Sequence, residues 1–318
     1  MNNLITDKFS PVHSLKLFAL KEHFYNFVKL HKNQKLPKII LLTGEKGIGK
    51  FTLIFHFINY ILSLNSNHSY DYENLSIDKN NDSYKKILLN VEQNFNYIGS
   101  AKPNPATIEN IRDIKKSFYK SSLNSRPRFT VLDDVELMNI NAANALLKLI
   151  EEPSVYDYFV LINNKKQNII ETLRSRSIEI KIFLETEEKN KIFNFLKENF
   201  KIENNFLNNY LELTTPGMLI KFSDLFDMAK IGEELSFDNM ILKFLAQFKK
   251  TKNILCLDLV NFLLDIKFSK LTSENNTGSL EILETKKKLT NLVNQYRKFN
   301  LNSNTVLNQF KIYFNHAR

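Results

Sequence analysis

The chain has 318 residues, 43% hydrophobic and 25% charged, a composition typical of a globular protein with room for two or three domains. The single cysteine, Cys256, excludes a disulfide framework and a four-cysteine zinc site, and we expect this thiol to fill space in the core. The formal net charge of +10 is compatible with nucleic-acid binding, but the lysines are scattered among asparagines and isoleucines, so a basic solvated surface explains the charge equally well.

The N-terminal segment contains no targeting or membrane signal. Residues 1–10 lack the apolar core of a signal peptide, and no segment reaches the roughly eighteen uninterrupted apolar residues of a membrane span. We therefore expect a soluble, cytoplasmic protein. Apolar residues recur at helical spacing between Pro11 and Leu30, which predicts an N-terminal helix.

A glycine-rich turn, Gly-Glu-Lys-Gly-Ile-Gly-Lys, separates a predicted buried strand at Ile39 to Leu42 from a predicted buried helix at Phe51 to Leu62. Glycines let backbone N–H groups point at phosphate oxygens, the helix start adds a partial positive charge, and a lysine can reach the outer phosphates. The candidate nucleotide-binding residues of this loop are Gly44, Gly47, Gly49, Lys50 and Thr52. The alternative is a degenerate turn that binds nothing.

The residue after Lys50 departs from the phosphate-loop pattern. The full pattern has Ser or Thr there, because that hydroxyl holds the Mg²⁺ of the nucleotide, whereas this chain has Phe51 and places Thr52 one residue late. A helix turns about 100° per residue, so Thr52 cannot take the place of the missing hydroxyl. We therefore predict a nucleotide pocket with weak or no hydrolysis.

Between the loop and the next clear strand the pattern is weaker. Residues 63–83 are rich in Asn, Ser and Asp and predict a surface insertion. Ile87 to Ile98 fits a short helix or a strand. Pro103 and Pro105 interrupt the chain, and apolar residues from Ile108 to Phe118 then predict an amphipathic helix.

An apolar run from Phe129 to Leu132 predicts a buried strand that ends in two acids, Asp133 and Asp134. A P-loop NTPase places at this point a carboxylate that holds Mg²⁺ through water, and often a second one that polarises the attacking water. The alternative is an Asp pair that caps the loop after a buried strand. The acids and the glycine-rich turn together favour the nucleotide site.

The next elements complete a parallel sheet. A helix is predicted from an Asn141 cap to Pro153, and a strand from Tyr158 to Ile162, ending in Asn163 and Asn164. A last strand is predicted at Ile178 to Phe183. Strands that alternate with helices predict a three-layer α/β domain, residues 1–183.

No strand candidate remains beyond Glu185. Apolar residues at helical spacing predict short helices in residues 184–232 and longer ones in 233–318. The predicted fold class is therefore α/β followed by all-α, in three domains.

Three segments carry a family resemblance: Leu132 to Met138, the Asn-Ala-Leu-Leu-Lys helix that ends in Glu-Glu-Pro at Pro153, and Ser175-Arg176-Ser177. Together they resemble the clamp-loader branch of the AAA+ ATPases, over about Leu36 to Ile182. The resemblance implies an AAA+ P-loop domain, a small helical lid and a C-terminal helical collar that holds an oligomer together.

The resemblance also implies roles for single residues. The implied nucleotide-binding positions are Gly44, Gly49, Lys50, Asp133, Asp134 and, as the polar sensor, Asn163. Arg176 matches the arginine finger, which acts on the nucleotide of the neighbouring subunit; the alternative is a surface salt bridge, for example with Glu179. Three departures argue against hydrolysis in cis: Phe51, Asp134 in place of Glu, and Met218 in place of a sensor arginine.

The implied function is a stator subunit that lends Arg176 while a clamp loader places a sliding clamp on primed DNA. The implied partners are the other clamp-loader subunits, and ATP is the candidate cofactor. No zinc is expected, since the cysteines that many relatives hold after the phosphate-loop helix are absent. The alternative is a self-contained AAA+ motor that hydrolyses ATP in its own ring. A nucleotide kinase lacks support, because no acceptor-site motif is present.

Overall fold

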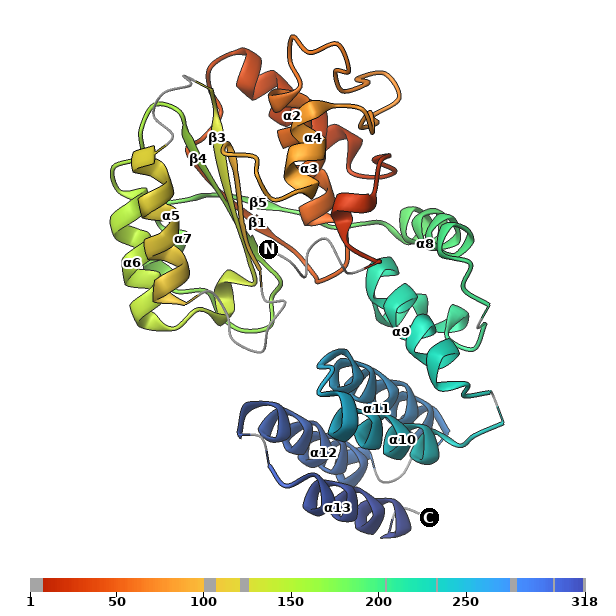
Figure 1. Cartoon of the computed structure of the whole chain (residues 1–318). Helices are drawn as coiled ribbons and strands as arrows, with labels where there is room; N and C mark the ends of the chain where they lie inside the picture. The colour runs from red at the N-terminus through yellow and green to blue at the C-terminus, as the bar shows by residue number, and fades with distance from the viewer. Residues whose placement is uncertain are drawn as a thin grey trace. The chain divides into compact units, whose positions relative to one another are not determined.

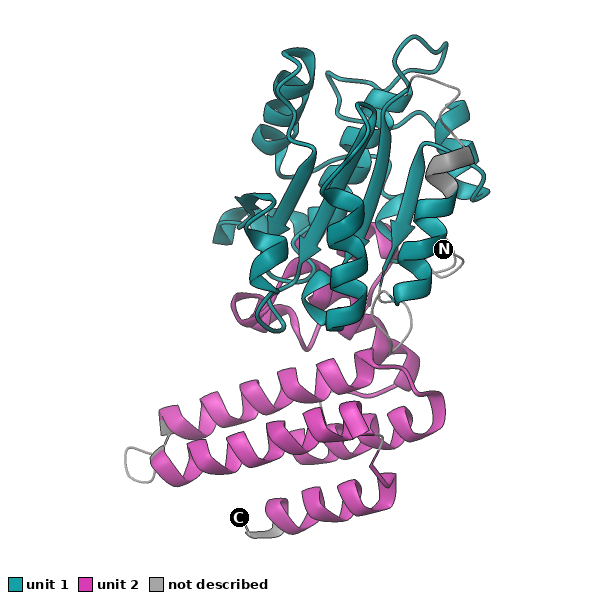
Figure 2. Cartoon of the chain, turned by 90° about the vertical axis from the view of Figure 1, so that its left-hand side faces the viewer, with its two compact units in different colours: residues 1–192 teal, residues 193–318 magenta. Residues whose placement is uncertain are grey.

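A computed structural model of the chain describes residues 8–99, 107–120, 126–203, 205–232, 234–274, 279–299 and 301–316. The chain divides into two compact units, Met1–Ile192 and Phe193–Arg318 (Figure 2). The finer division into three domains, with boundaries at 183 and 232, stays a prediction.

The first unit is built on a five-stranded parallel sheet. Its strands are β1 (Ile39–Thr43), β2 (Phe95–Ile98), β3 (Arg128–Asp133), β4 (Asp157–Asn163) and β5 (Ile178–Lys181). Their order is β2-β3-β4-β1-β5. Because all strands run in parallel, the segments after β1, β3 and β4 emerge at the same edge of the sheet. This edge is where an open α/β sheet binds its ligands.

Helices cover both faces of the sheet (Figure 1). One face carries α2 (Lys21–Lys32), α3 (Lys50–Leu62) and α4 (Asp82–Leu88), and the other carries α5 (Ile108–Lys120), α6 (Ile140–Ile150) and α7 (Glu171–Arg174). Two separate clusters of buried side chains fill the two interfaces. The structure thus confirms the predicted three-layer α/β architecture.

Several element boundaries differ from the sequence predictions. The N-terminal segment forms a short 3₁₀ helix, η1 (Pro11–His13), and then α2, which begins only after Leu20 adopts a left-handed conformation with φ of 62°. The ambiguous stretch from Ile87 to Ile98 contains the end of α4 and then β2. Asn139, and not Asn141, caps α6, since its side chain accepts a 2.8 Å hydrogen bond from the N–H of Ala142.

Residues 63–83 are only partly the surface insertion that their composition predicts. Tyr70, Leu75 and Ile77 are buried in the core cluster beneath α2 and α3. The Tyr70 hydroxyl hydrogen-bonds the Nδ1 of His56 at 2.9 Å, which fastens the segment to α3. The polar composition of the segment gave no indication that these three residues are buried, because exposed residues separate them. Pro103 and Pro105 lie outside the described residues.

Among its described residues, the regular elements of the second unit are all helices. Helix α8 (Thr186–Phe200) leads into it and is followed by η3 (Asn208–Leu213), α9 (Pro216–Ala229), α10 (Phe237–Thr251), α11 (Leu255–Glu274), α12 (Ser279–Phe299) and α13 (Ser303–His316). Cys256 is fully buried in α11, in agreement with the prediction, and burial raises the pKa of its thiol to about 11. No helix among the described residues is long and apolar enough to cross a membrane.

Candidate functional site

The glycine-rich turn between β1 and α3 has a backbone that only glycines fit well. Gly47 and Gly49 have φ angles of 88° and 94°, in the left-handed region that side chains disfavour. A Cβ atom on Gly44 would lie 2.5 Å from the carbonyl oxygen of Ile182 and 2.6 Å from Cδ1 of Ile48. The backbone therefore has the tight curvature that the sequence predicts for a phosphate loop.

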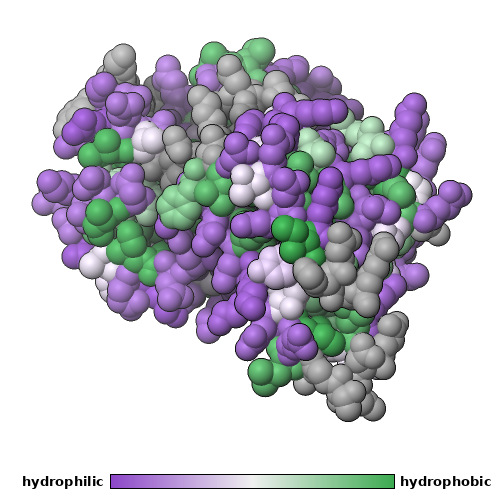
Figure 3. Space-filling view, turned by 90° about the horizontal axis from the view of Figure 1, so that it is seen from below, coloured by the Kyte–Doolittle hydropathy of each residue, from purple (hydrophilic) through white to green (hydrophobic). Residues whose placement is uncertain are grey.

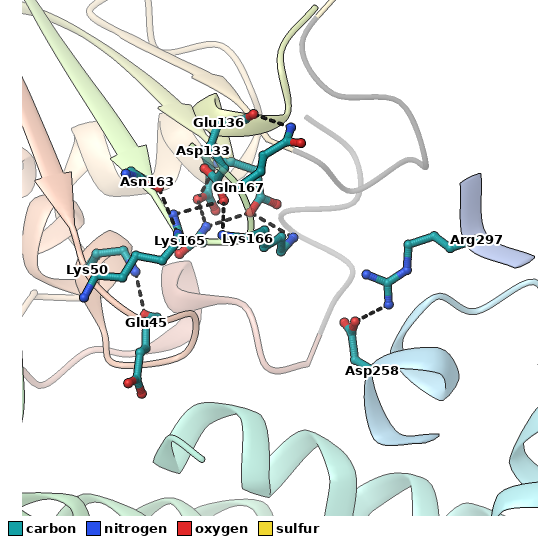
Figure 4. A network of polar contacts seen from close by, with 12 residues as sticks. Glu45, Lys50, Asp133, Glu136, Asn163, Lys165, Lys166, Gln167, Asp258 and Arg297 are labelled. Carbon is teal, nitrogen blue, oxygen red and sulfur yellow. Dashed lines mark hydrogen bonds and ion pairs between the residues drawn. The ribbon is translucent and has the colours of Figure 1, made fainter. Parts of the chain in front are cut away.

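Lys50 turns its ammonium group back onto this loop. Its Nζ donates hydrogen bonds to the carbonyl oxygens of Gly44 at 2.8 Å and Glu45 at 2.6 Å, the second of which is drawn in Figure 4. Only 3% of the residue is exposed. Burial lowers the pKa of Lys50 to about 8, while the nearby Asp133 acts in the opposite direction. The lysine therefore stays predominantly protonated at neutral pH and can transfer its donors to a phosphate.

Phe51 belongs to the hydrophobic core. Its ring stacks with Phe55 at a centroid distance of 5.9 Å and meets Tyr97 edge-on at 4.8 Å. The residue is 7% exposed and is part of the core cluster between α3 and the sheet. The position that would hold a Mg²⁺-binding hydroxyl is thus filled by a packed ring, and Thr52 is half-buried one residue further round the helix.

The two acids after β3 are joined by one amide. Nδ2 of Asn164 donates to Oδ1 of Asp133 and to Oδ1 of Asp134, both at 2.8 Å. Oδ1 of Asp133 also accepts the N–H of Asp134 at 2.9 Å, and the Tyr97 hydroxyl lies 3.4 Å from Oδ2. Lys166 forms a 3.0 Å ion pair with Oδ1 of Asp134, which is 1% exposed and has a φ angle of 55°. Burial and the neighbouring Asp134 raise the pKa of Asp133.

Glu136 is a third acid of this site, and the sequence analysis did not single it out. Its side chain is buried, and Oε1 accepts the N–H groups of Asn164 at 3.1 Å and Lys166 at 3.4 Å. Its backbone carbonyl accepts a hydrogen bond from Gln167 (Figure 4). Burial, reinforced by Asp134, raises the pKa of Glu136. The only sequence signal was a third carboxylate two residues after the Asp pair.

Asn163 joins the loop after β4 to the phosphate loop. It pairs with Thr43 in the sheet register, and its carbonyl oxygen accepts the N–H of Gly44 at 3.2 Å. Its Oδ1 accepts the N–H of Lys165 at 2.8 Å. Asn164, and not Asn163, supplies the amide that contacts the acids. The sensor role of Asn163 stays a prediction.

Arg176 lies at the exposed corner between α7 and β5. Its guanidinium contacts Oε1 of Glu151 at 3.2 Å and the carbonyl oxygen of Thr172 at 3.2 Å. The surface salt bridge that the sequence analysis kept as the alternative is thus present, but its partner is Glu151 and not Glu179, because Arg174 takes the Glu179 carboxylate at 2.9 and 3.2 Å. The Arg176 and Glu151 side chains are 42% and 48% exposed. Water therefore competes for both members of this pair.

The structure thus gathers most of the predicted nucleotide-binding residues at one edge of the sheet. The phosphate loop, the acids after β3 and the loop after β4 meet there, and the side chain of Lys165 extends toward Lys50 (Figure 4). Among the described residues, no group of three or more His, Cys, Asp or Glu side chains could hold a metal ion. Phe51 offers no oxygen to the Mg²⁺ of a nucleotide, and Asp134 is ion-paired with Lys166.

The sequence matches known replication proteins. The family model for the DNA polymerase III delta subunit covers residues 20–185, just over half of the chain. The chain is 26% identical over 249 residues to DNA polymerase III subunit delta' of Buchnera aphidicola subsp. Schizaphis graminum, 76% of this chain and 74% of that protein. It is 29% identical over 188 residues to subunit delta' of Buchnera aphidicola subsp. Acyrthosiphon pisum, 59% of this chain and 56% of that protein.

A gamma subunit and a solved structure are also similar. DNA polymerase III subunit gamma of Buchnera aphidicola subsp. Schizaphis graminum is 28% identical over 212 residues, 66% of this chain and 55% of that protein. The crystal structure of a gamma subunit-related protein from Thermotoga maritima aligns with a TM-score of 0.49 and 19% identity, over 92% of this chain and 99% of that one. The family match and the delta' relatives agree with each other. The chain therefore belongs to the DNA polymerase III delta subunit family, as a delta-prime-like member of the AAA+ clamp loaders.

Proposed function

We propose that this chain is the stator of a replicative clamp loader. In this role it binds gamma/tau-like and delta-like subunits and presents Arg176 to the nucleotide of a neighbour, and it turns over little or no ATP itself. The assembled complex opens a sliding clamp and places it on primed DNA. The observation that carries the proposal is the position of Arg176, half exposed at a corner of the sheet domain, where the described residues hold it through an exposed carboxylate and one carbonyl.

The chemistry of this arginine explains why its exposure matters. A guanidinium beside a γ-phosphate neutralises the charge that develops as the phosphoryl group leaves, which contributes about 10³ to 10⁵ in rate in other phosphoryl-transfer systems. Such a group has to leave its own surface to reach the next subunit. An exposed ion pair is worth about 1 kcal/mol or less, so the contact with Glu151 is easily given up. Arg174 makes two contacts with Glu179 and is held more firmly.

The residues on this chain's own nucleotide site support a non-hydrolysing role. Phe51 supplies no metal ligand, and Asp134 is neutralised by Lys166. Met218, in the first turn of α9, supplies no positive charge where hydrolysing relatives have an arginine. A self-contained motor would need all three functions in cis. A steady-state ATPase rate of the purified chain comparable with that of an active AAA+ protein would favour the motor.

The helical region 233–318 supports assembly. Leu280, Leu283, Phe299 and Ile312 are each more than half exposed on α12 and α13. Figure 3 shows hydrophobic residues in separate patches among hydrophilic ones on the face seen from below. Apolar side chains of this kind are suited to packing against equivalent helices of other subunits. We expect the double variant Leu280→Glu, Leu283→Glu to lose co-purification with partner subunits, whereas Leu89→Glu in the first unit should keep it.

The decisive experiment compares two neighbouring arginines in the assembled complex. Arg176→Ala should lower the clamp-stimulated ATPase and clamp-loading rates by about 10³-fold or more at the junction that this chain completes. Arg176→Lys should fall nearly as far, because the planar guanidinium matches phosphate oxygens and an ammonium does not. Arg174→Ala is the matched control and should have little effect. A complex carrying Arg176→Ala that assembles and hydrolyses ATP normally at every site contradicts the proposal.

A further inference from the structure

We propose that the phosphate loop of this chain binds the polyphosphate of a nucleotide without Mg²⁺, with lysine side chains in place of the divalent cation. The inference rests on the nucleotide pocket of the proposed function and is independent of the role of Arg176. It names a ligand class, a nucleoside di- or triphosphate in its metal-free form. Three features of the site lead to it.

The first feature is the ring of Phe51. In a hydrolysing site this position gives the metal a hydroxyl oxygen. Here the ring is packed between Phe55 and Tyr97 and is 7% exposed. A packed core leaves no room for the ring to turn aside and admit a hydrated cation. No oxygen ligand can come from this position of the helix.

The second feature is that one oxygen of each acid is occupied by hydrogen bonds or an ion pair within the protein, whereas Oε2 of Glu136 is buried without a hydrogen-bond partner among the described residues. Each carboxylate oxygen accepts about two hydrogen bonds. Oδ1 of Asp133 accepts from the N–H of Asp134 and from Asn164, and Oδ1 of Asp134 accepts from Asn164 and Lys166. Oε1 of Glu136 is likewise taken by two N–H groups of the following loop. A Mg²⁺ site that used these Oδ1 and Oε1 atoms, directly or through water, would have to break this network.

The third feature is the positive charge around the loop. The side chain of Lys165 extends toward Lys50 (Figure 4) and acts to lower its pKa, against the larger opposite effect of the three acids. Lys46 acts electrostatically on Asp133. Like charges gathered at a glycine loop repel one another, and a bound anion relieves that repulsion. The backbone N–H groups at the start of α3 add donors for phosphate oxygens. The site thus offers lysine side chains to an anion beside its three acids.

The test measures binding of ATP, ADP and inorganic tripolyphosphate to the full chain by calorimetry, once with excess Mg²⁺ and once with EDTA. The dissociation constants of ATP in the two conditions should agree within about threefold. Lys50→Ala should abolish binding, and Lys165→Met, at an exposed position, should weaken it by about tenfold in both conditions. Lys79→Met removes an exposed charge elsewhere on the same unit and should leave the affinity unchanged.

Two results would overturn the inference. One is affinity that falls more than tenfold when EDTA replaces Mg²⁺, since a metal would then be part of the ligand. The other is the absence of binding in both conditions, with the fold of the chain verified by its thermal unfolding. Neither result touches the trans role of Arg176, which the rates of the assembled complex test separately. If Lys50→Ala fails to fold, Lys165→Met still decides whether the lysines of this loop hold the phosphate.

Discussion

The phosphate-loop site and the corner that carries Arg176 differ in how deeply their charged groups are buried and in how many contacts hold them. At the phosphate loop, Lys50 and Asp134 are almost completely buried and are satisfied by neighbours within the same chain. At the corner, Arg176 and Glu151 are both about half exposed and meet through one contact. Buried polar groups are costly to rearrange, whereas exposed pairs are cheap to break. A site of the first kind favours holding a ligand, and one of the second kind favours releasing a side chain to a partner.

The largest loss of unfolding free energy should come from removing Phe51, because its buried ring packs in the core at the position where a phosphate loop has a hydroxyl residue. Removing a buried aromatic ring costs about 3–5 kcal/mol of unfolding free energy, and Phe51→Ala should fall in that range. Urea denaturation of the full chain measures it. Thr52→Ala, at the half-buried neighbouring position, should cost about 1 kcal/mol or less. Equal losses for the two variants would show that the ring is not part of the core.

His56 extends the comparison to the middle of α3, where a titratable ring is buried and no charged side chain of the described residues pairs with it. Its Nε2 faces the carbonyl oxygen of Ser14 at 2.8 Å and its Nδ1 faces the hydroxyl of Tyr70 at 2.9 Å, an arrangement that suits the neutral ring. Burial lowers the pKa of His56 to about 4 from 6.5. Its contribution to stability is therefore complete above pH 6.5.

Below pH 6.5, His56 becomes protonated in the unfolded chain but stays neutral in the folded chain. The free energy of unfolding therefore falls until the pH reaches about 4. The loss over this window should be about 3 kcal/mol, at 1.36 kcal/mol for each pH unit. Denaturation curves between pH 7 and pH 4 measure it. His56→Gln should be less stable at pH 7 and should lose this part of the pH dependence. His68→Gln, at an exposed position, should retain it.

Lys166 tests the buried network after β3. Its ammonium is the cation paired with the buried carboxylate of Asp134. Because the lysine side chain is 26% exposed, Lys166→Met should cost only about 1–2 kcal/mol, below the loss for a fully buried pair. Adding Asp134→Asn should recover part of that loss, since the unpaired charge is then gone. A double-mutant cycle with strictly additive losses would mean that the two side chains do not interact.

The strand ends could be predicted from the sequence, and the side chains that face one another could not. Apolar runs bounded by Gly, Asp and Asn place β1, β3 and β4 within about one residue of their observed ends. Strand periodicity, however, does not say which of two successive asparagines turns toward the acids, because the chain leaves the strand between Asn163 and Asn164. Asn164 was therefore missed as the residue that bridges Asp133 and Asp134.

The sequence patterns also failed to predict the roles of buried polar residues. Glu136 and His56 gave no periodic signal, and their roles come from partners 14 to 42 residues away in the sequence. Composition described residues 63–83 as polar surface, although Tyr70 is held in the core by His56. Long-range hydrogen bonds of this kind depend on how the elements pack, which local patterns do not encode.

The smallest effect should come from Glu151, which holds Arg176 on its own subunit. An exposed pair of this kind contributes about 1 kcal/mol or less and weakens as salt rises. Glu151→Gln should therefore change the unfolding free energy by less than that amount and remove its salt dependence at this corner, while Glu152→Gln removes the adjacent charge as a matched control. In the assembled complex, Glu151→Gln should change the ATPase rate by less than about tenfold, the factor that corresponds to 1.36 kcal/mol. A loss as deep as that of Arg176→Ala would instead assign Glu151 to the reacting site, and the corner would no longer be a surface from which the arginine is simply released.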